Sequence, residues 1–144
     1  MLMSTPTILV IEDNPAEVVL LRHALDQLNQ DYVLDVLPDG EAALRFVHDH
    51  RSGAREPHPC VILLDLYLPK HDGLAVLEAI RRQPALTHIR VVVLSGYANP
   101  RDLKAVREMD ALFRSKPSSL AEYADLAAEI VVLCKGGDRI ASAV

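Results

Sequence analysis

Short apolar runs alternate with amphipathic segments along this chain, and the alternation limits the possible folds more than any other feature. Apolar runs of strand length occupy five places: 7–11, 32–37, 60–64, 91–94 and 111–113. Each run is followed by a segment that opens on a helix-capping residue: Asn14, Asp39, Asp72, Asn99 and Ser119. Such side chains accept hydrogen bonds from the free backbone amides of a first helical turn. The sequence therefore predicts five strand–helix pairs.

Two of these runs, 60–64 and 91–94, are apolar at every position rather than at alternate ones. Continuous apolarity is typical of strands covered on both faces, as in a parallel sheet between two layers of helices. Connections between parallel strands are almost always right-handed, which leaves few topologies. We expect an α/β fold of the flavodoxin-like (βα)5 type, a three-layer sandwich around a parallel five-stranded sheet in the order 2-1-3-4-5.

The chain has the size of one domain. Its 144 residues are half apolar, which is enough for a core without disulfide bonds. We expect one folded unit over 6–135 and a flexible C-terminal tail over 136–144. The net charge of -5 argues against nucleic acids or anionic lipids as partners. No apolar run approaches the roughly 18–20 residues needed to cross a bilayer, and residues 1–6 carry no secretory signal.

The cysteines and histidines receive no functional role from their pattern. Cys60 and Cys134 are the only cysteines and follow no disulfide or metal-site spacing, so a reduced, cytoplasmic location is the simplest interpretation. Cys60 lies in a buried apolar run, where we expect inert packing. His48, His50 and His58 do not have the spacing of a helix-borne metal pair, and we expect them to be exposed.

Polar residues follow four of the five predicted strands. Glu12 and Asp13 follow the first strand, Asp65 the third, Ser95 the fourth and Lys116 the fifth. The carboxyl ends of parallel strands meet at one edge of the sheet, which is where such folds bind ligands. We therefore expect three carboxylates, one hydroxyl and one ammonium to converge at this edge.

Three carboxylates brought together repel one another. Two unit charges 4 Å apart repel by roughly 4 kcal/mol at an effective dielectric constant of ~20. The pocket must therefore take up protons or hold a cation, and oxygen ligands without His or Cys favour Mg²⁺. A phosphoryl group on Asp65 would join the parts, because its oxygens would meet the metal ion, the Lys116 ammonium and the Ser95 hydroxyl. Phosphoryl transfer needs mainly such positioning and charge neutralisation.

Four segments carry a resemblance to a known family: 8–14 (ILVIEDN), 64–73 (LDLYLPKHDG), 93–96 (VLSG) and 114–117 (RSKP). Together, and in this order, they resemble the receiver domains of response regulators in two-component signalling, over nearly the whole chain. The opening EDNPAE, the longer loop at 51–59 and the lack of an output domain resemble most the small regulators that are paired with bacterial phytochromes.

The resemblance implies a phosphorylation switch rather than an enzyme that acts on other substrates. Asp65 matches the phosphoacceptor, and Glu12 and Asp13, with Asp65 itself and the backbone carbonyl of Tyr67, match the Mg²⁺ ligands. The implied donor is a sensor histidine kinase, here of the phytochrome type, in the cytoplasm. Phosphorylation would then change a protein-binding face and shift the population between two states.

Further residues of the switch follow from the same resemblance. Ser95 and Lys116 match the hydroxyl and the ammonium that contact the phosphoryl group, and Gly96 matches a backbone contact to it. Phe113 matches the aromatic residue whose rotamer reports the switch. The family often has Thr, Ala and Tyr at these Ser, Gly and Phe positions, so the departures are mild, although Phe113 lacks the hydroxyl of a tyrosine.

Two tyrosines are predicted at the mouth of the pocket. Tyr67 lies two residues past Asp65, and Tyr97 lies two residues past Ser95. Water must pass this mouth to hydrolyse an acyl phosphate. We hypothesise that the two rings restrict this water and lengthen the life of the phosphorylated form.

Several alternatives compete with the switch. Each site residue taken singly has an ordinary explanation as a turn residue, but all of them are predicted at one edge. Phosphatases that form an aspartyl phosphate typically place a second Asp where this chain has Tyr67. A flavin or nucleotide binder would need a phosphate-binding loop after the first strand, where Glu12 and Asp13 would repel phosphate. A receiver-like scaffold that is never phosphorylated stays open.

The last predicted helix has more apolar residues than one face needs: Leu126, Ile130, Val131, Val132 and Leu133. It is either a buried terminal helix or a surface for a partner. In the family, the side formed by the fourth and fifth helices commonly carries dimerisation, so the resemblance implies a homodimer through that face.

Overall fold

Strands and helices alternate through the described part of the chain. The computed structural model describes residues 5–50, 58–97 and 99–136. The strands are β1 (Thr7–Ile11), β2 (Val33–Leu37), β3 (Val61–Asp65), β4 (Arg90–Ser95) and β5 (Leu112–Ser115). The helices are α1 (Pro15–Asp26), α2 (Gly40–Asp49), α3 (Gly73–Arg82), α4 (Pro100–Glu108) and α5 (Leu120–Cys134). The five predicted strand–helix pairs are therefore confirmed, and their strand boundaries agree to within two residues.

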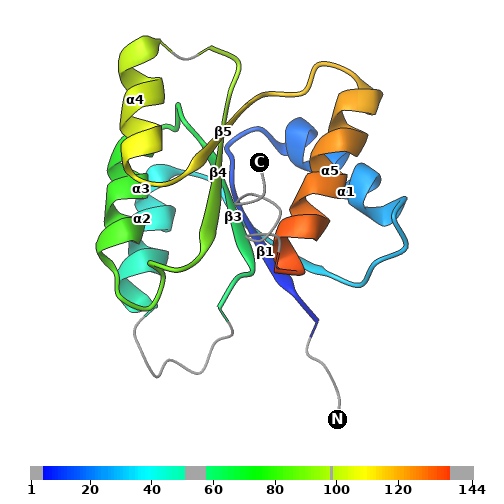
Figure 1. Ribbon diagram of the computed structural model, residues 1–144, viewed down its shortest axis with the longest axis horizontal. Helices are drawn as coiled ribbons and strands as arrows, with labels where there is room; N and C mark the ends of the chain where they lie inside the picture. Colours follow the sequence, from blue (N-terminus) through cyan, green and yellow to red (C-terminus); the bar gives the residue numbers. More distant parts are fainter. Residues whose placement is uncertain (1–4, 51–57, 98, 137–144) are drawn as a thin grey trace.

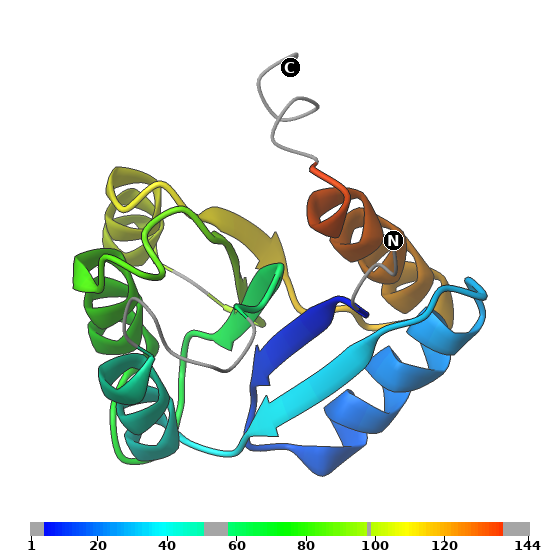
Figure 2. The same ribbon diagram turned by 90° about the horizontal axis from the view of Figure 1, so that it is seen from below.

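The five strands form one parallel sheet in the order β2-β1-β3-β4-β5. Helices α2, α3 and α4 cover one face of the sheet, and α1 and α5 cover the other (Figures 1 and 2). The predicted flavodoxin-like three-layer sandwich is therefore confirmed. Strand order reverses between β1 and β3, which places the predicted ligand edge at the carboxyl ends of these two strands.

Alternate residues of each strand enter two separate cores. Leu9, Ile62 and Val93 belong to the core under α2, α3 and α4, whereas Val10 and Leu63 belong to the core under α1 and α5. All five residues of β3 are buried, as continuous apolarity predicted. A strand enclosed on both faces is a rigid support for the carboxylate at its end.

The predicted segments outside the helices and strands are described only in part. Of the loop predicted at 51–59, the structure describes His58 and Pro59, and of the tail predicted at 136–144 it describes Gly136. The remaining residues of both segments lie outside the described part of the chain. Among the described helices, none is both long and apolar enough to span a membrane.

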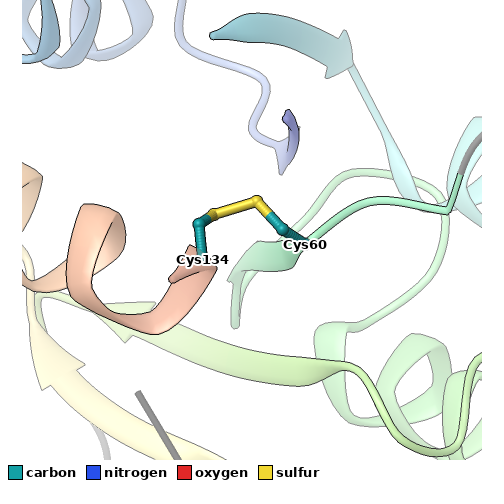
Figure 3. The surroundings of a disulfide bond; sticks show 2 residues. All are labelled: Cys60 and Cys134. Atoms are coloured by element: carbon teal, nitrogen blue, oxygen red, sulfur yellow. A yellow bond between two sulfur atoms is a disulfide. The ribbon is translucent and has the colours of Figure 1, made fainter. Parts of the chain in front are cut away.

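Cys60 and Cys134 form a disulfide bond, which the sequence analysis did not predict (Figure 3). Cys60 directly precedes β3 and Cys134 is the last residue of α5, so their Cα atoms lie 4.9 Å apart although 74 residues separate them. The interpretation of Cys60 as an inert packing residue is wrong. With both thiols oxidised, the cysteine pattern also gives no support for a reducing compartment.

His50 is buried, contrary to the prediction of exposed histidines. It is 2% exposed, and its ring lies 4.8 Å from the ring of Phe46 between centroids. Its Nε2 atom faces the Nδ1 atom of His58 at 2.5 Å. His50 is the C-cap residue of α2, one helical turn after Phe46. His48 and His58 are exposed, as predicted.

The apolar excess of α5 is mostly used inside the protein. Leu126, Ile130 and Leu133 are buried in the core shared with α1, and Val131 packs against it. Val132 is 37% exposed. The description of α5 as a buried terminal helix therefore accounts for most of its apolar residues, and the homodimer stays a prediction.

Candidate functional site

One ammonium group holds three carboxylates at the carboxyl edge of the sheet. The Nζ atom of Lys116 lies 3.2 Å from Oε1 of Glu12, 3.2 Å from Oδ2 of Asp65 and 3.0 Å from Oε2 of Glu17. These groups come from the ends of β1 and β3, the first turn of α1 and the residue after β5. The convergence of Glu12, Asp65 and Lys116 is as the strand pattern predicted.

Backbone hydrogen bonds between neighbouring chain segments continue just beyond the strand ends and hold these residues in place. The amide of Glu12 donates to the carbonyl of Leu37 over 3.0 Å, beyond the end of β1. The amide of Lys116 donates to the carbonyl of Ser95 over 3.0 Å, beyond the end of β5. Asp65 is itself the last residue of β3. Each charged side chain thus leaves a strand end whose position is set by a neighbouring strand.

Three carboxylates lie close enough to share a divalent cation. Ligand oxygens of Glu12, Asp13 and Asp65 lie within 4.8 Å of one another. Glu12 and Asp65 are 7% and 5% exposed, whereas Asp13 is exposed and leaves the site open to solvent. An all-oxygen set with an open side fits a hard cation that keeps some of its water, such as Mg²⁺. The donor set therefore fits the predicted metal.

Burial and charge shift the proton affinities in this pocket. Desolvation raises the pKa of Glu12 to about 7, and the nearby charge of Asp65 acts in the same direction. Burial acts to lower the pKa of Lys116, but its hydrogen bond to Glu17 and the charges of Asp65 and Glu12 outweigh this and raise the pKa above the usual lysine range. Lys116 therefore stays charged while Glu12 resists full ionisation.

Glu17 belongs to this cluster although the sequence assigns it no role in the site: it lies three residues past the cap Asn14, the position of the acidic residue in a capping box. The cap of α1 is made by the Asn14 side chain, which accepts a hydrogen bond from the amide of Ala16 over 3.0 Å. The amide of Asn14 donates to Glu12 over 3.1 Å and not to Glu17. The Glu17 carboxylate is thereby left to bind Lys116, 99 residues away.

The hydroxyl of Ser95 is buried and bound to its own loop. Ser95 is 1% exposed at the end of β4. Its hydroxyl donates to the carbonyl of Tyr97 and accepts from the amide of Tyr97 over 3.1 Å. Ser95 therefore lies at the predicted edge, but its described hydrogen bonds do not reach the carboxylates. Gly96 is exposed, and a Cβ atom placed on it would contact nothing within 4 Å.

The two tyrosines that were predicted at the mouth of the pocket differ in how they are held. The amide of Tyr67 donates to Oδ1 of Asp65 over 3.1 Å, and its hydroxyl donates to Oδ2 of Asp102 in α4 over 2.9 Å. This hydrogen bond to Asp102 raises the pKa of Tyr67. Tyr67 is 52% exposed, whereas Tyr97 is 71% exposed. Tyr67 is thus tied to both the carboxylate and α4.

Phe113 lies apart from the carboxylate cluster. It pairs with Val93 in the sheet, two residues before the end of β4. Its half-buried ring packs against the core under α2, α3 and α4. Phe113 therefore lies between the sheet and the helices of that core.

A glycine lets the first turn of α3 approach the loop that follows Asp65. A Cβ atom on Gly73 would lie 2.5 Å from the carbonyl oxygen of Leu66 and 2.7 Å from that of Asp65. The amide of Gly73 donates to the Leu66 carbonyl over 2.8 Å. Any larger residue would have to push this loop, and with it the region of the carboxylate, outwards.

Known proteins share both the sequence and this architecture. Residues 8–127 match the model of the response regulator receiver domain. Response regulator Rcp1 of Synechocystis sp. is 40% identical over 102 residues, which cover 71% of this chain and 69% of that protein.

Two solved structures are similar over most of their length. The Mn²⁺-bound form of Rcp1 has a TM-score of 0.76 at 34% identity, and the match covers 88% of this chain and 92% of the other. The phosphorylated cyanobacterial phytochrome response regulator RcpA has a TM-score of 0.79 at 30% identity, and the match covers 90% and 93%. One relative thus holds a divalent cation and the other a phosphoryl group.

Proposed function

The chain belongs to the response regulator receiver domain family, and on this basis we propose that it is a switch in which Asp65 accepts a phosphoryl group from a sensor histidine kinase with the help of Mg²⁺. The observation that carries the proposal is the contact of the Lys116 ammonium with the Asp65 carboxylate at 3.2 Å, beside the other carboxylates of the possible metal site. A pocket of this composition needs added positive charge, and it can use that charge to bind phosphate.

The donor set supports Glu12, Asp13 and Asp65 as ligands of the cation, with the carbonyl of Tyr67 as a further predicted ligand. When bound, Mg²⁺ would neutralise charge on the phosphoryl oxygens as it does in other phosphoryl transfers. The Mn²⁺-bound form of the relative Rcp1 supports a divalent ion in this family.

The transfer itself is a displacement at phosphorus. An oxygen of Asp65 attacks the phosphorus of a phosphohistidine on the kinase, so that an O–P bond forms, the N–P bond breaks, and its electron pair stays on the imidazole. Lys116 is placed to stabilise the charge on the transferred group. Ser95 contributes only after its hydroxyl leaves the carbonyl of Tyr97 and turns towards the phosphoryl oxygens.

The switch follows from this movement of Ser95. The hydroxyl would leave a space at the end of β4, which pairs with β5. Phe113 lies on β5 and packs against the core under α2, α3 and α4. A coupled change of Ser95 and Phe113 would alter the surface around α4 and so bias binding of a partner protein. A homodimer through α4 and α5 is one such partner complex.

A phosphatase acting through an aspartyl phosphate fits the pocket less well. The position two residues past Asp65 holds Tyr67, whose hydroxyl is engaged with Asp102 at 2.9 Å. The residue at this position therefore supplies no carboxylic acid to protonate a leaving group. The reaction is confined to gain and loss of the protein's own phosphoryl group.

The metal assignment is tested by the Mg²⁺ dependence of labelling with acetyl phosphate. Asp13→Asn removes an exposed ligand, so the Mg²⁺ concentration for half-maximal labelling should rise by at least about tenfold. Asp72→Asn is the matched control, since Asp72 caps α3 at the same edge without belonging to the carboxylate cluster. An unchanged Mg²⁺ requirement in Asp13→Asn would contradict the assignment.

The access of water is tested by the decay of the phosphorylated form after the donor is removed. Tyr67→Ala should speed decay several-fold, because it opens the mouth beside Asp65 and frees Asp102. Tyr97→Ala should have the smaller effect, because Tyr97 is the more exposed ring. Tyr67→Phe keeps the ring and loses only the bond to Asp102. Equal or slower decay in both alanine variants would end this hypothesis.

The family supports a proposal for the partner and the compartment. The similarity to RcpA and Rcp1 supports a phytochrome-type histidine kinase as the donor. Such a donor implies that the chain acts in the cytoplasm. The negative net charge of -5 gives no support for a nucleic-acid partner.

A further inference from the structure

The Glu17 carboxylate makes a contact that neither the metal site nor the helix cap requires. Its Oε2 atom lies 3.0 Å from Nζ of Lys116, the shortest of the three ion pairs of this lysine. Glu17 is outside the group of carboxylates that can share a cation. Its side chain is partly buried, with 24% of it exposed. The Glu17–Lys116 ion pair therefore lies in a partly desolvated environment.

The Lys116 ammonium is surrounded by carboxylates, with hydrogen bonds to Glu17 and Asp65 and an ion pair to Glu12. An ammonium has three donors, and Lys116 has three carboxylate partners, namely Glu12, Glu17 and Asp65. A phosphoryl oxygen on Asp65 must compete with the remaining carboxylates for this ammonium. Glu12 and Asp65 are also the proposed cation ligands, so a bound cation fixes their positions. Glu17 is not a proposed cation ligand, so a bound cation does not fix its position.

We propose that Glu17 is a positioning residue that latches Lys116 in the resting state and must release it when Asp65 is phosphorylated. The inference rests on the proposed function and assigns a regulatory residue to the same site. The latch opposes phosphorylation because the Glu17 carboxylate competes with the phosphoryl group for the Lys116 ammonium.

The position of Glu17 in the fold explains how the latch reaches across the molecule. Glu17 lies in the first turn of α1, and Lys116 follows β5, with α1 packed beside α5 on the same face of the sheet (Figure 1). Release of Lys116 would therefore free a contact between α1 and the loop before α5. The resting and phosphorylated forms would then differ at this contact between α1 and the loop before α5, as well as at α4.

The test is the rate of labelling by acetyl phosphate at a sub-saturating concentration and saturating Mg²⁺, followed by intact mass. Glu17→Gln should be labelled about three- to tenfold faster than the wild type, since it loses a partly buried charge pair that competes with the phosphoryl group. It should also lose the phosphoryl group more slowly once the donor is removed. Glu17→Asp, which keeps the charge but shortens the side chain, should show a smaller increase.

Two controls separate the latch from a general effect of charge or folding. Glu122 holds the same third position in α5 and binds Ser118 rather than Lys116, so Glu122→Gln should stay within about twofold of the wild type. In a Lys116→Gln background, Glu17→Gln should have a much reduced effect, because the shared partner is absent. A merely structural role of Glu17 would act equally in both backgrounds.

The outcomes are distinguishable from failure of the proposed function. If the wild type is not labelled on Asp65 at all, the proposed function fails. If the wild type is labelled and both Glu17 variants are labelled equally fast or more slowly, the latch is wrong and the switch stands. A faster Glu17→Gln with an undiminished effect in the Lys116→Gln background also overturns the latch.

Discussion

Asp65→Asn is expected to abolish labelling of the protein by acetyl phosphate while leaving the fold intact. The amide of asparagine is no nucleophile towards phosphorus, and the other carboxylates of the cluster, Glu12 and Asp13, stand in the proposed site as metal ligands. The substitution keeps the size of the side chain, and its oxygen can still accept hydrogen bonds from Tyr67 or Lys116. Intact mass before and after incubation with the donor and Mg²⁺ measures the result.

A matched variant shows whether the loss is specific. Asp72→Asn removes another carboxylate at the same edge of the sheet, one that caps α3, and it should be labelled like the wild type. Cooperative unfolding of Asp65→Asn at a midpoint close to that of the wild type would exclude misfolding as the cause. Full labelling of Asp65→Asn would mean that the phosphoryl group goes elsewhere, and the proposed acceptor would be wrong.

Reduction of the Cys60–Cys134 disulfide is expected to lower the free energy of unfolding by about 4 kcal/mol, from the chain entropy that a loop of this length regains in the unfolded state. The bond joins residues 74 positions apart, and it ties the end of α5 to the start of β3 (Figure 3). Cys134 also lines a cavity of about 630 Å³. Urea unfolding with and without dithiothreitol measures the difference.

The double variant Cys60→Ser/Cys134→Ser is the control for this measurement. It should unfold at lower urea concentration than the oxidised wild type and should not respond to dithiothreitol. A wild type whose unfolding midpoint is the same with and without the reductant would contradict a stabilising bond. Alkylation followed by mass spectrometry reports directly whether the two thiols are paired in the purified protein.

The fold and the centre of the site could be predicted because they depend on local patterns and on one geometric rule. The strand periods and caps give five strand–helix pairs, and a parallel sheet places all carboxyl ends of its strands at one edge. Glu12, Asp65 and Lys116 follow from that rule. In the structure, the Nζ atom of Lys116 lies 3.2 Å from a carboxylate oxygen of Glu12 and 3.2 Å from one of Asp65. The family motifs then assign roles that geometry alone leaves open.

The features that could not be predicted depend on pairs of residues far apart in the sequence. Glu17 looks like a first-turn capping residue until Lys116, 99 residues on, is placed beside it. Cys60 and Cys134 meet only because α5 returns along the sheet to the start of β3. None of these pairings leaves a periodic signal or a short motif in the sequence.

The claim on which the account depends is that carboxylates, one lysine and a divalent cation together hold a phosphoryl group on a single aspartate. The direct measurement is incubation with acetyl phosphate in the presence and absence of Mg²⁺, followed by mapping of the phosphoryl group by peptide mass spectrometry. The account predicts one phosphoryl group, on Asp65, only when Mg²⁺ is present. A phosphoryl group on another residue, or labelling of Asp65 that does not depend on a divalent cation, would contradict it.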